Sequence, residues 1–132
     1  MRLIDYSYEI PYSYVGNFVF ERKNDIVSFE DYQVLQSYTN ACSDILKEDP
    51  NSRKACATLN NWENTSCLIN IHFLINDNNL YVIANYRSQH ELLGRPYDEE
   101  LVKYLTTLFI KHNNFKFNSI KLKCHISDYH SK

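Results

Sequence analysis

The sequence predicts an α+β fold in which a mixed or antiparallel sheet packs with two main helices. Residues 28–47 and 98–111 space their apolar side chains at helical intervals. Residues 6–14, 68–86 and 120–126 instead alternate or run apolar, as strands do. The expected order is strand, helix, loop, hairpin, helix and strand, which is typical of the α+β class.

The N-terminal strand and the first helix have recognisable local patterns. Alternating tyrosines between residues 6 and 14 are typical of a half-buried strand, and sheet packing explains them better than a ligand does. Ser28, with Asp31 three residues later, forms a variant of the capping box. Apolar residues then recur at helical spacing to about Lys47, which predicts an amphipathic helix.

A hairpin and a second helix follow. The apolar runs 68–75 and 80–86 flank four turn-forming residues, Asn76-Asp77-Asn78-Asn79. Asp98 is a good N-cap, with two glutamates favourably placed behind it, and the helix that it begins is expected to end near Lys111. A last strand is expected from residue 120 to 126.

Length and charge limit what the chain can do. Its 132 residues suffice for one domain, residues 1–132, with a single core. The net charge is −2 with both signs interspersed, so the chain lacks a basic face that could neutralise a run of phosphates. A polymeric nucleic acid is therefore not expected as a partner.

The N-terminus and the cysteines indicate a cytoplasmic protein. Polar residues interrupt the N-terminus, which lacks the apolar core of a signal peptide, and the longest apolar run is too short to cross a bilayer. Cys42, Cys56, Cys67 and Cys124 form no Cys-x-x-Cys pair and lie mostly within apolar segments. Buried or reactive thiols in a reducing compartment are thus favoured over a disulfide framework, and no membrane association is expected.

Cys67 is a candidate nucleophile. A hairpin turning at Asp77 would bring it near Arg87, because each lies about ten residues from the turn on opposite strands. A nearby guanidinium stabilises a thiolate and lowers the pKa of the thiol. Spacing alone leaves two interpretations open, a nucleophile and a small buried hydrophobic residue.

Two further groups of polar residues allow a functional interpretation. Arg53 and Lys54 follow an Asp-Pro turn and could form a phosphate clamp, although a solvated loop is the ordinary interpretation. His125, His130 and Cys124 could suggest a metal, but their spacing gives poor convergence. We therefore expect no metal.

Four short motifs follow one another along the chain at specific spacings. They are Asp49-Pro50-Asn51-Ser52-Arg53-Lys54, then Cys67, then Arg87-Ser88, and then Gly94-Arg95-Pro96-Tyr97-Asp98. Together they resemble the thymidylate synthase and cytidylate hydroxymethylase superfamily, which has an Asp-Pro-x-Ser-Arg-Arg loop, a nucleophilic cysteine, an Arg-Ser pair and a Gly-x-Pro-Phe-Asn helix start in this order. The resemblance covers residues 49–130 and implies the fold of that family.

The resemblance implies a pyrimidine mononucleotide as the ligand. Arg87 and Ser88 would bind its 5′-phosphate, and Arg53 and Lys54 would reach the same phosphate from the neighbouring subunit of a homodimer. His125 matches the histidine of the family's His-x-Tyr motif, which faces the sugar.

The resemblance also implies the chemistry. Cys67 would add to carbon 6 of the pyrimidine, and carbon 5 would then attack a one-carbon donor, in this family methylene-tetrahydrofolate. Asp98 stands where thymidylate synthases have the asparagine that reads uracil and where cytidylate hydroxymethylases have aspartate. A carboxylate accepts hydrogen bonds from the amino group of cytosine, which favours a cytosine nucleotide. A plain N-cap is the alternative role of Asp98.

The chain departs from the family pattern at several positions. Ser66-Cys67-Leu68 replaces Pro-Cys-His, Gln89-His90 replaces x-Asp after the Arg-Ser pair, and Ser127 replaces the tyrosine of His-x-Tyr. The Glu-Leu-x-Trp segment that supplies the family's catalytic glutamate is not found, and the tail that closes over folate is expected to be absent. Nucleotide binding therefore agrees with the sequence better than folate-dependent transfer does.

Three functions remain open. The favoured one is a transferase of nucleotide biosynthesis, which hydroxymethylates or methylates carbon 5 of a cytosine mononucleotide through Cys67. The second is a catalytically degenerate protein of the same fold that binds the nucleotide or regulates a relative. The third is a structural domain without nucleotide affinity. The preserved cysteine favours the enzyme, whereas the missing glutamate favours the binder.

Overall fold

The computed structural model describes residues 1–20, 27–59 and 66–131. The elements in these ranges are β1 (Arg2–Ile10), α1 (Phe29–Glu48), β2 (Cys56–Thr58), β3 (Leu68–Asn76), β4 (Asn79–His90), α2 (Arg95–His112) and β5 (Ser119–His130). Every element expected from the sequence is present. The additional strand β2 has three residues, too few for an apolar period to reveal it.

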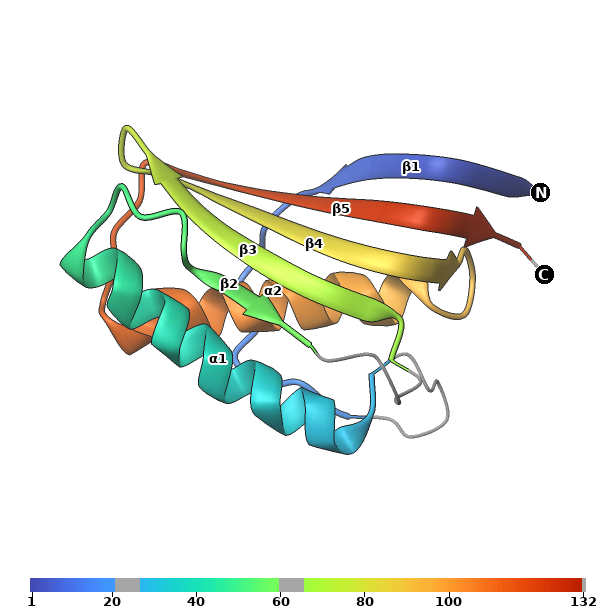
Figure 1. Cartoon of the computed structure of the whole chain (residues 1–132), viewed down its shortest axis with the longest axis horizontal. Coiled ribbons are helices and arrows are strands. Elements are labelled where there is room, and N and C mark those ends of the chain that lie inside the picture. The colour runs from blue at the N-terminus through green and yellow to red at the C-terminus, as the bar shows by residue number, and fades with distance from the viewer. Residues whose placement is uncertain (21–26, 60–65, 132) are drawn as a thin grey trace.

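The strands form one sheet in the order β1-β5-β4-β3-β2, and both helices lie on the same face of it (Figure 1). Neighbouring strands are antiparallel except for β4 and β5, which are parallel because α2 returns the chain to the starting edge of β4. The fold is therefore α+β with a mixed sheet, as predicted. Within the described ranges, neither helix is long and apolar enough to span a membrane.

Local sequence rules determine the start of α1 and the turn between β3 and β4. The Ser28 hydroxyl caps α1 by accepting a hydrogen bond from the Asp31 N–H at 3.1 Å. Asp77 and Asn78 have positive φ angles of 51° and 57°, which tight hairpin turns require and which Asp and Asn tolerate better than most residues. Both predictions are confirmed.

The regular alternation of buried and exposed side chains is interrupted at the same level of three neighbouring strands. In β5 the buried positions alternate up to Ile126 and resume at Tyr129, one residue out of step. In β4 the same shift occurs between Tyr86 and Gln89. At the same level of β1, Asp5 has a φ of 59° and the pairing with β5 skips one position. The shift places Gln89 and Tyr129 on the buried face, where a regular strand would expose them.

The β3–β4 hairpin therefore has two different ends. We call the end that holds Asp77 and Asn78 the turn end, and the end that holds Cys67 and Arg87 the bend end. Both strands are regular near the turn end, with residues paired from Asn76↔Asn79 onward, whereas the β3–β4 register shifts between Leu68 and Asn70.

The helix α2 starts three residues earlier than the sequence predicts. It begins at Arg95, with Gly94 as its N-cap and Pro96 in its first turn. Proline presets a helical φ and needs no partner for an N–H, so it starts the helix ahead of Asp98. The Asp98 N–H donates to the Gly94 carbonyl at 2.9 Å, and the prediction that Asp98 is the N-cap is wrong. The Asp98 side chain is instead fully buried.

The limits of the strands also differ from the expectation. β4 and β5 continue to His90 and His130, because they pair with each other along their length. β1 ends at Ile10, so Tyr12 and Tyr14 lie beyond it, and their hydroxyls form hydrogen bonds with α2.

The core fills the space between the helices and the sheet. Phe73 of β3 and Phe109 of α2 stack at its centre with ring centroids 4.5 Å apart, and both are fully buried. All four cysteines are free thiols, as the sequence favoured.

Candidate functional site

The hairpin brings Cys67 and Arg87 together at the bend end. The Arg87 N–H donates to the Cys67 carbonyl at 2.9 Å, and Arg87 Nε donates to the Ser66 carbonyl at 3.3 Å. Cys67 is half-buried and Arg87 is exposed. The predicted proximity of the two residues is confirmed.

Burial is the largest influence on the Cys67 thiol, and it raises the pKa of this group. Arg87 lowers the pKa, as expected, while Asp98 raises it. The net shift is upward, so burial outweighs the activation expected from Arg87 in the free protein. Arg87 and Asp98 are nevertheless both close enough to Cys67 to act on its thiol electrostatically.

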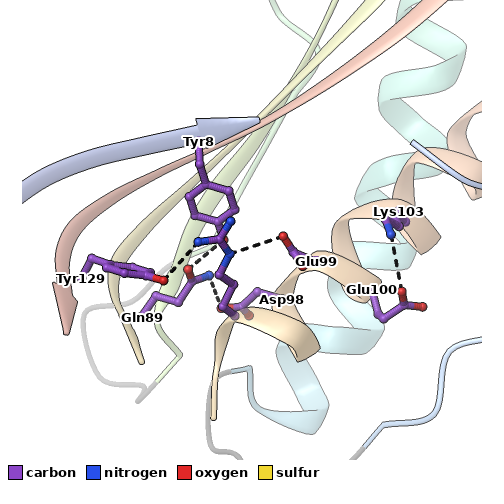
Figure 2. A network of polar contacts seen from close by, with 8 residues as sticks. Tyr8, Gln89, Asp98, Glu99, Glu100, Lys103 and Tyr129 are labelled. Atoms are coloured by element: carbon purple, nitrogen blue, oxygen red, sulfur yellow. Dashed lines mark hydrogen bonds and ion pairs between the residues drawn. The ribbon is translucent and has the colours of Figure 1, made fainter. Parts of the chain in front are cut away.

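Asp98 ends a buried chain of hydrogen bonds that starts on β1. The Tyr8 hydroxyl donates to Gln89 Oε1 at 2.7 Å, and Gln89 Nε2 donates to Asp98 Oδ2 at 2.8 Å (Figure 2). Three elements, β1, β4 and α2, thus hold the carboxyl group in one orientation.

Burial raises the pKa of Asp98 to about 8, and the hydrogen bonds of the carboxyl group with Gln89 and the nearby Tyr86 hydroxyl lower it by less. At neutral pH the group is therefore mostly a protonated acid, with one donor and one acceptor. Among the described residues, neither Asp98 Oδ1 nor the Tyr86 hydroxyl has a hydrogen-bond partner of ordinary geometry. Asp98 Oδ1 and the Tyr86 hydroxyl are thus two polar atoms of this site that lack a well-placed partner.

Arg95, the first residue of α2, packs against the same network. Its guanidinium lies 3.8 Å from the centre of the Tyr8 ring and donates to the Tyr129 hydroxyl at 3.1 Å. It also pairs with Glu99 at 3.4 Å, one helical turn along (Figure 2). These contacts connect the start of α2 to β1 and β5.

Arg53 and Lys54 lie far from the bend end within one chain. The Arg53 carbonyl contacts His72 Nε2 at 3.0 Å, and both cations are exposed. His72 is about five residues along β3 from Cys67, a distance of roughly 17 Å. A single chain therefore does not bring these cations to Arg87.

The last two candidate residues from the sequence are Ser88 and His125. Ser88 directly follows Arg87 on β4 and is half-buried. His125 lies between two buried residues of β5, so its side chain is on the sheet face away from the helices, where it contacts the Asp5 carboxylate. His125 and Asp98 are therefore on opposite faces of the sheet.

Sequence reasoning missed Ser66, Tyr8, Gln89 and Arg95. Tyr8 was predicted to pack in the sheet, and nothing local indicates that its hydroxyl reaches β4. Ser66 stands at a position where the chain departs from the family pattern, and this departure was the available signal for it. Gln89 occupies the variable position of the Arg-Ser-x-Asp pattern, which gives no signal. Within the described ranges, no group of three or more His, Cys, Asp or Glu side chains could hold a metal ion.

Comparisons with known proteins identify the fold. No protein-family model and no curated protein sequence matches the chain. The crystal structure of thymidylate synthase from T4 phage superposes with a TM-score of 0.61 at 18% sequence identity. The matched region covers 70% of this chain and 34% of that enzyme, so the chain spans about a third of its length. The chain therefore has a thymidylate-synthase-like α+β fold.

Proposed function

We propose that this protein binds a pyrimidine mononucleotide at the bend end and modifies carbon 5 of the base through Cys67. One observation carries the proposal. The Cys67 thiol lies at one end of a thymidylate-synthase-like sheet, where the Arg87 cation and the buried Asp98 carboxyl group both act on it and the Arg87 N–H bonds the Cys67 carbonyl.

Arg87 and Ser88 are proposed to hold the 5′-phosphate. The guanidinium can offer two parallel N–H donors to phosphate oxygens, and the Ser88 hydroxyl can offer a third. The exposed position of Arg87 beside the Cys67 carbonyl would place the phosphate close to the thiol.

Cys67 is proposed to form a bond from its thiolate Sγ to carbon 6 of the base. The electrons of the 5,6 double bond then make carbon 5 nucleophilic, and its new bond would form with a one-carbon electrophile. Loss of the carbon 5 proton and expulsion of the thiolate would restore the double bond. Because burial raises the pKa of Cys67 in the free protein, the thiolate must form within the nucleotide complex.

Asp98 is proposed to read the pyrimidine edge. With Oδ2 occupied by Gln89, a protonated Oδ1 can donate to N3 of cytosine or to O4 of uracil. The ionised form instead accepts from the cytosine amino group. A preference for cytosine is therefore expected to grow as the pH rises through about 8. Asp98→Asn should remove this pH dependence, as the ratio of cytidylate to uridylate affinities would show.

The described residues do not form a recognisable folate site. The buried polar atoms without a partner at the bend end are Asp98 Oδ1 and the Tyr86 hydroxyl. A pterin ring has more donors and acceptors than these two atoms can satisfy. We therefore assign none of these residues to methylene-tetrahydrofolate.

A homodimer is proposed to complete the phosphate site. Both helices cover one face of the sheet, and a second copy packing on the other face would form an isologous contact (Figure 1). In that arrangement Arg53 and Lys54 of one subunit would reach the phosphate of the other. A monomer at micromolar concentration with full nucleotide affinity in sedimentation and binding experiments would contradict this assembly.

Calorimetric titration tests nucleotide binding. We expect cytidylate, uridylate or their deoxy forms to bind, and the corresponding nucleosides to bind much more weakly. Arg87→Ala should remove the difference between nucleotide and nucleoside. Arg2→Ala is the control, because Arg2 is an exposed arginine that pairs with Asp128. Equal affinity for nucleotide and nucleoside in the unmodified protein would refute the phosphate assignment.

The second candidate function is a binder without chemistry, and the raised pKa of Cys67 favours it. Exchange of the carbon 5 hydrogen for deuterium distinguishes the two, because reversible thiol addition allows this exchange without a one-carbon donor. Exchange that disappears in Cys67→Ser supports the enzyme. Tight binding without exchange supports the binder.

A further inference from the structure

Ser66 connects the start of β3 to the N-terminus of α1 through a closed set of hydrogen bonds. Its hydroxyl donates to Asp31 Oδ2 at 2.6 Å and accepts from the Ser28 N–H at 2.9 Å. The Ser28 hydroxyl in turn accepts from the Asp31 N–H at 3.1 Å. Ser66 is fully buried, whereas its partners Ser28 and Asp31 are half-buried.

The same residue also meets Arg87 on its other side. Arg87 Nε donates to the Ser66 carbonyl at 3.3 Å, and the Arg87 N–H donates to the next carbonyl, that of Cys67, at 2.9 Å. The backbone of Ser66 and Cys67 is therefore held by the start of α1 through the Ser66 side chain and by β4 through two successive carbonyl groups.

A serine at this position needs contacts from other segments to hold its backbone. The resembling family has proline before its cysteine, and proline restricts the backbone by its ring alone. Serine has no such restriction, so the backbone before Cys67 would be free to vary without external contacts. The bonds to Ser28 and Asp31 supply those contacts, at sequence separations of 38 and 35 residues.

We propose that Ser66 and Asp31 are positioning residues, which hold the Cys67 thiol in a half-buried orientation beside Arg87. The inference rests on the proposed role of Cys67 and deepens it. It assigns a task to the N-terminal turn of α1, which contributes no group to the nucleotide. Among the described residues, the charged groups that act on the thiol are Arg87 and Asp98.

The first readout is the alkylation of Cys67 by iodoacetamide as a function of pH, in the absence of nucleotide. Peptide mass spectrometry separates Cys67 from the other three cysteines. Ser66→Ala and Asp31→Ala should release the thiol from its buried orientation. The midpoint of the pH–rate profile should then fall toward that of an ordinary thiol, and alkylation at neutral pH should accelerate by about three- to tenfold.

The second readout is the exchange rate of the carbon 5 hydrogen. In Ser66→Ala and Asp31→Ala this rate should fall, whereas the alkylation rate should rise. A misplaced thiol should lose about tenfold to a hundredfold in exchange rate. Asp31→Asn is the conservative variant, because its amide oxygen still accepts from Ser66. It should keep the alkylation profile of Cys67 and the exchange rate of the unmodified protein.

Ser28→Ala is the matched control. It removes the hydroxyl cap of the same helix end but keeps the Ser28 N–H that donates to Ser66. It should lower the melting temperature without changing the Cys67 profile. If Ser66→Ala does not fold, Asp31→Ala allows the same comparison, because it removes the same hydrogen bond from the acceptor side.

Two results would overturn the inference. One is an alkylation profile of Cys67 that is the same in Ser66→Ala, Asp31→Ala and the unmodified protein. The other is an equal change in Ser28→Ala, which would indicate a general loosening of α1. Because alkylation is measured without nucleotide, a failure of nucleotide binding would refute the proposed function and leave this test decisive.

Discussion

The two ends of the β3–β4 hairpin follow different rules. At the turn end, residues pair regularly, buried and exposed positions alternate, and Asp77 and Asn78 supply the φ angles that the turn needs. At the bend end the alternation shifts, and polar side chains such as Gln89 and Asp98 become buried. The comparison shows that the turn end follows regular sheet rules, whereas the bend end buries polar groups, as proteins often do where they bind a ligand, which is the role that we propose for it.

Among the substitutions, removing apolar volume from the regular part of β3 should have the largest effect on stability. Phe73→Ala deletes a fully buried ring that stacks on Phe109, and it should cost about 3–5 kcal/mol of unfolding free energy. Urea denaturation measures this loss. Lys121→Ala, an exposed change on β5, should stay within about 0.5 kcal/mol. A small loss for Phe73→Ala would contradict the stability role of this region.

The pH dependence of stability should reveal the buried Asp98. The folded carboxyl group keeps its proton up to a pH of about 8, whereas the unfolded one releases it near the ordinary pKa of 3.8. Stability from this group is therefore complete below about pH 4 and falls as the pH rises toward 8. The slope should approach ~1.4 kcal/mol per pH unit.

Asp98→Asn is the matched variant for this measurement, because it has similar shape and no proton to release. The difference in unfolding free energy between the two proteins, measured by urea denaturation from pH 4 to 8, isolates the contribution of Asp98. A difference that does not change with pH would mean that the carboxyl group ionises normally in the folded state.

Gln89→Leu should have the next largest effect. It leaves the buried Tyr8 hydroxyl and Asp98 Oδ2 without their partner, at a cost of about 1–3 kcal/mol. It should also raise the pKa of Asp98 further, since Gln89 lowers it. Tyr8→Phe, which removes only one of the two bonds, should cost less. Equal stability of Gln89→Leu and the unmodified protein would show that the network is not maintained in solution.

Substitution at Asp77 should have the smallest effect on stability and none on binding. Asp77→Gly relieves the left-handed φ of 51°, whereas Asp77→Ala does not. The two variants should differ by about 1–2 kcal/mol in unfolding free energy. Nucleotide affinity should be the same in both, and a change in affinity would remove the distinction between the two ends of the hairpin.

The sequence predicted the elements that depend on local rules. The cap at Ser28 and the turn at Asp77 were predicted because each depends on a few adjacent residues. The pairing of Cys67 with Arg87 followed from their equal distances to that turn. These three features fix the start of α1 and the β3–β4 hairpin.

The features that were not predicted from the sequence depend on contacts between distant segments. Asp98 was predicted to be a cap because its own propensity was considered without that of Pro96. The shift of alternation between Tyr86 and Gln89 involves three strands at once, so no single strand shows it. The hydrogen bonds of Ser66 join residues 35 and 38 positions apart, beyond the reach of any local pattern.

A titration followed by two-dimensional amide NMR tests the central claim, because it reports on both ends of the hairpin at once. On addition of a pyrimidine nucleoside monophosphate, the amide signals of Cys67, Arg87 and Ser88 should shift with a common saturation curve. Those of Asp77 and Asn78 should remain unchanged. Shifts that appear mainly at the turn end, or no shifts at millimolar nucleotide, would contradict a nucleotide site at the bend end.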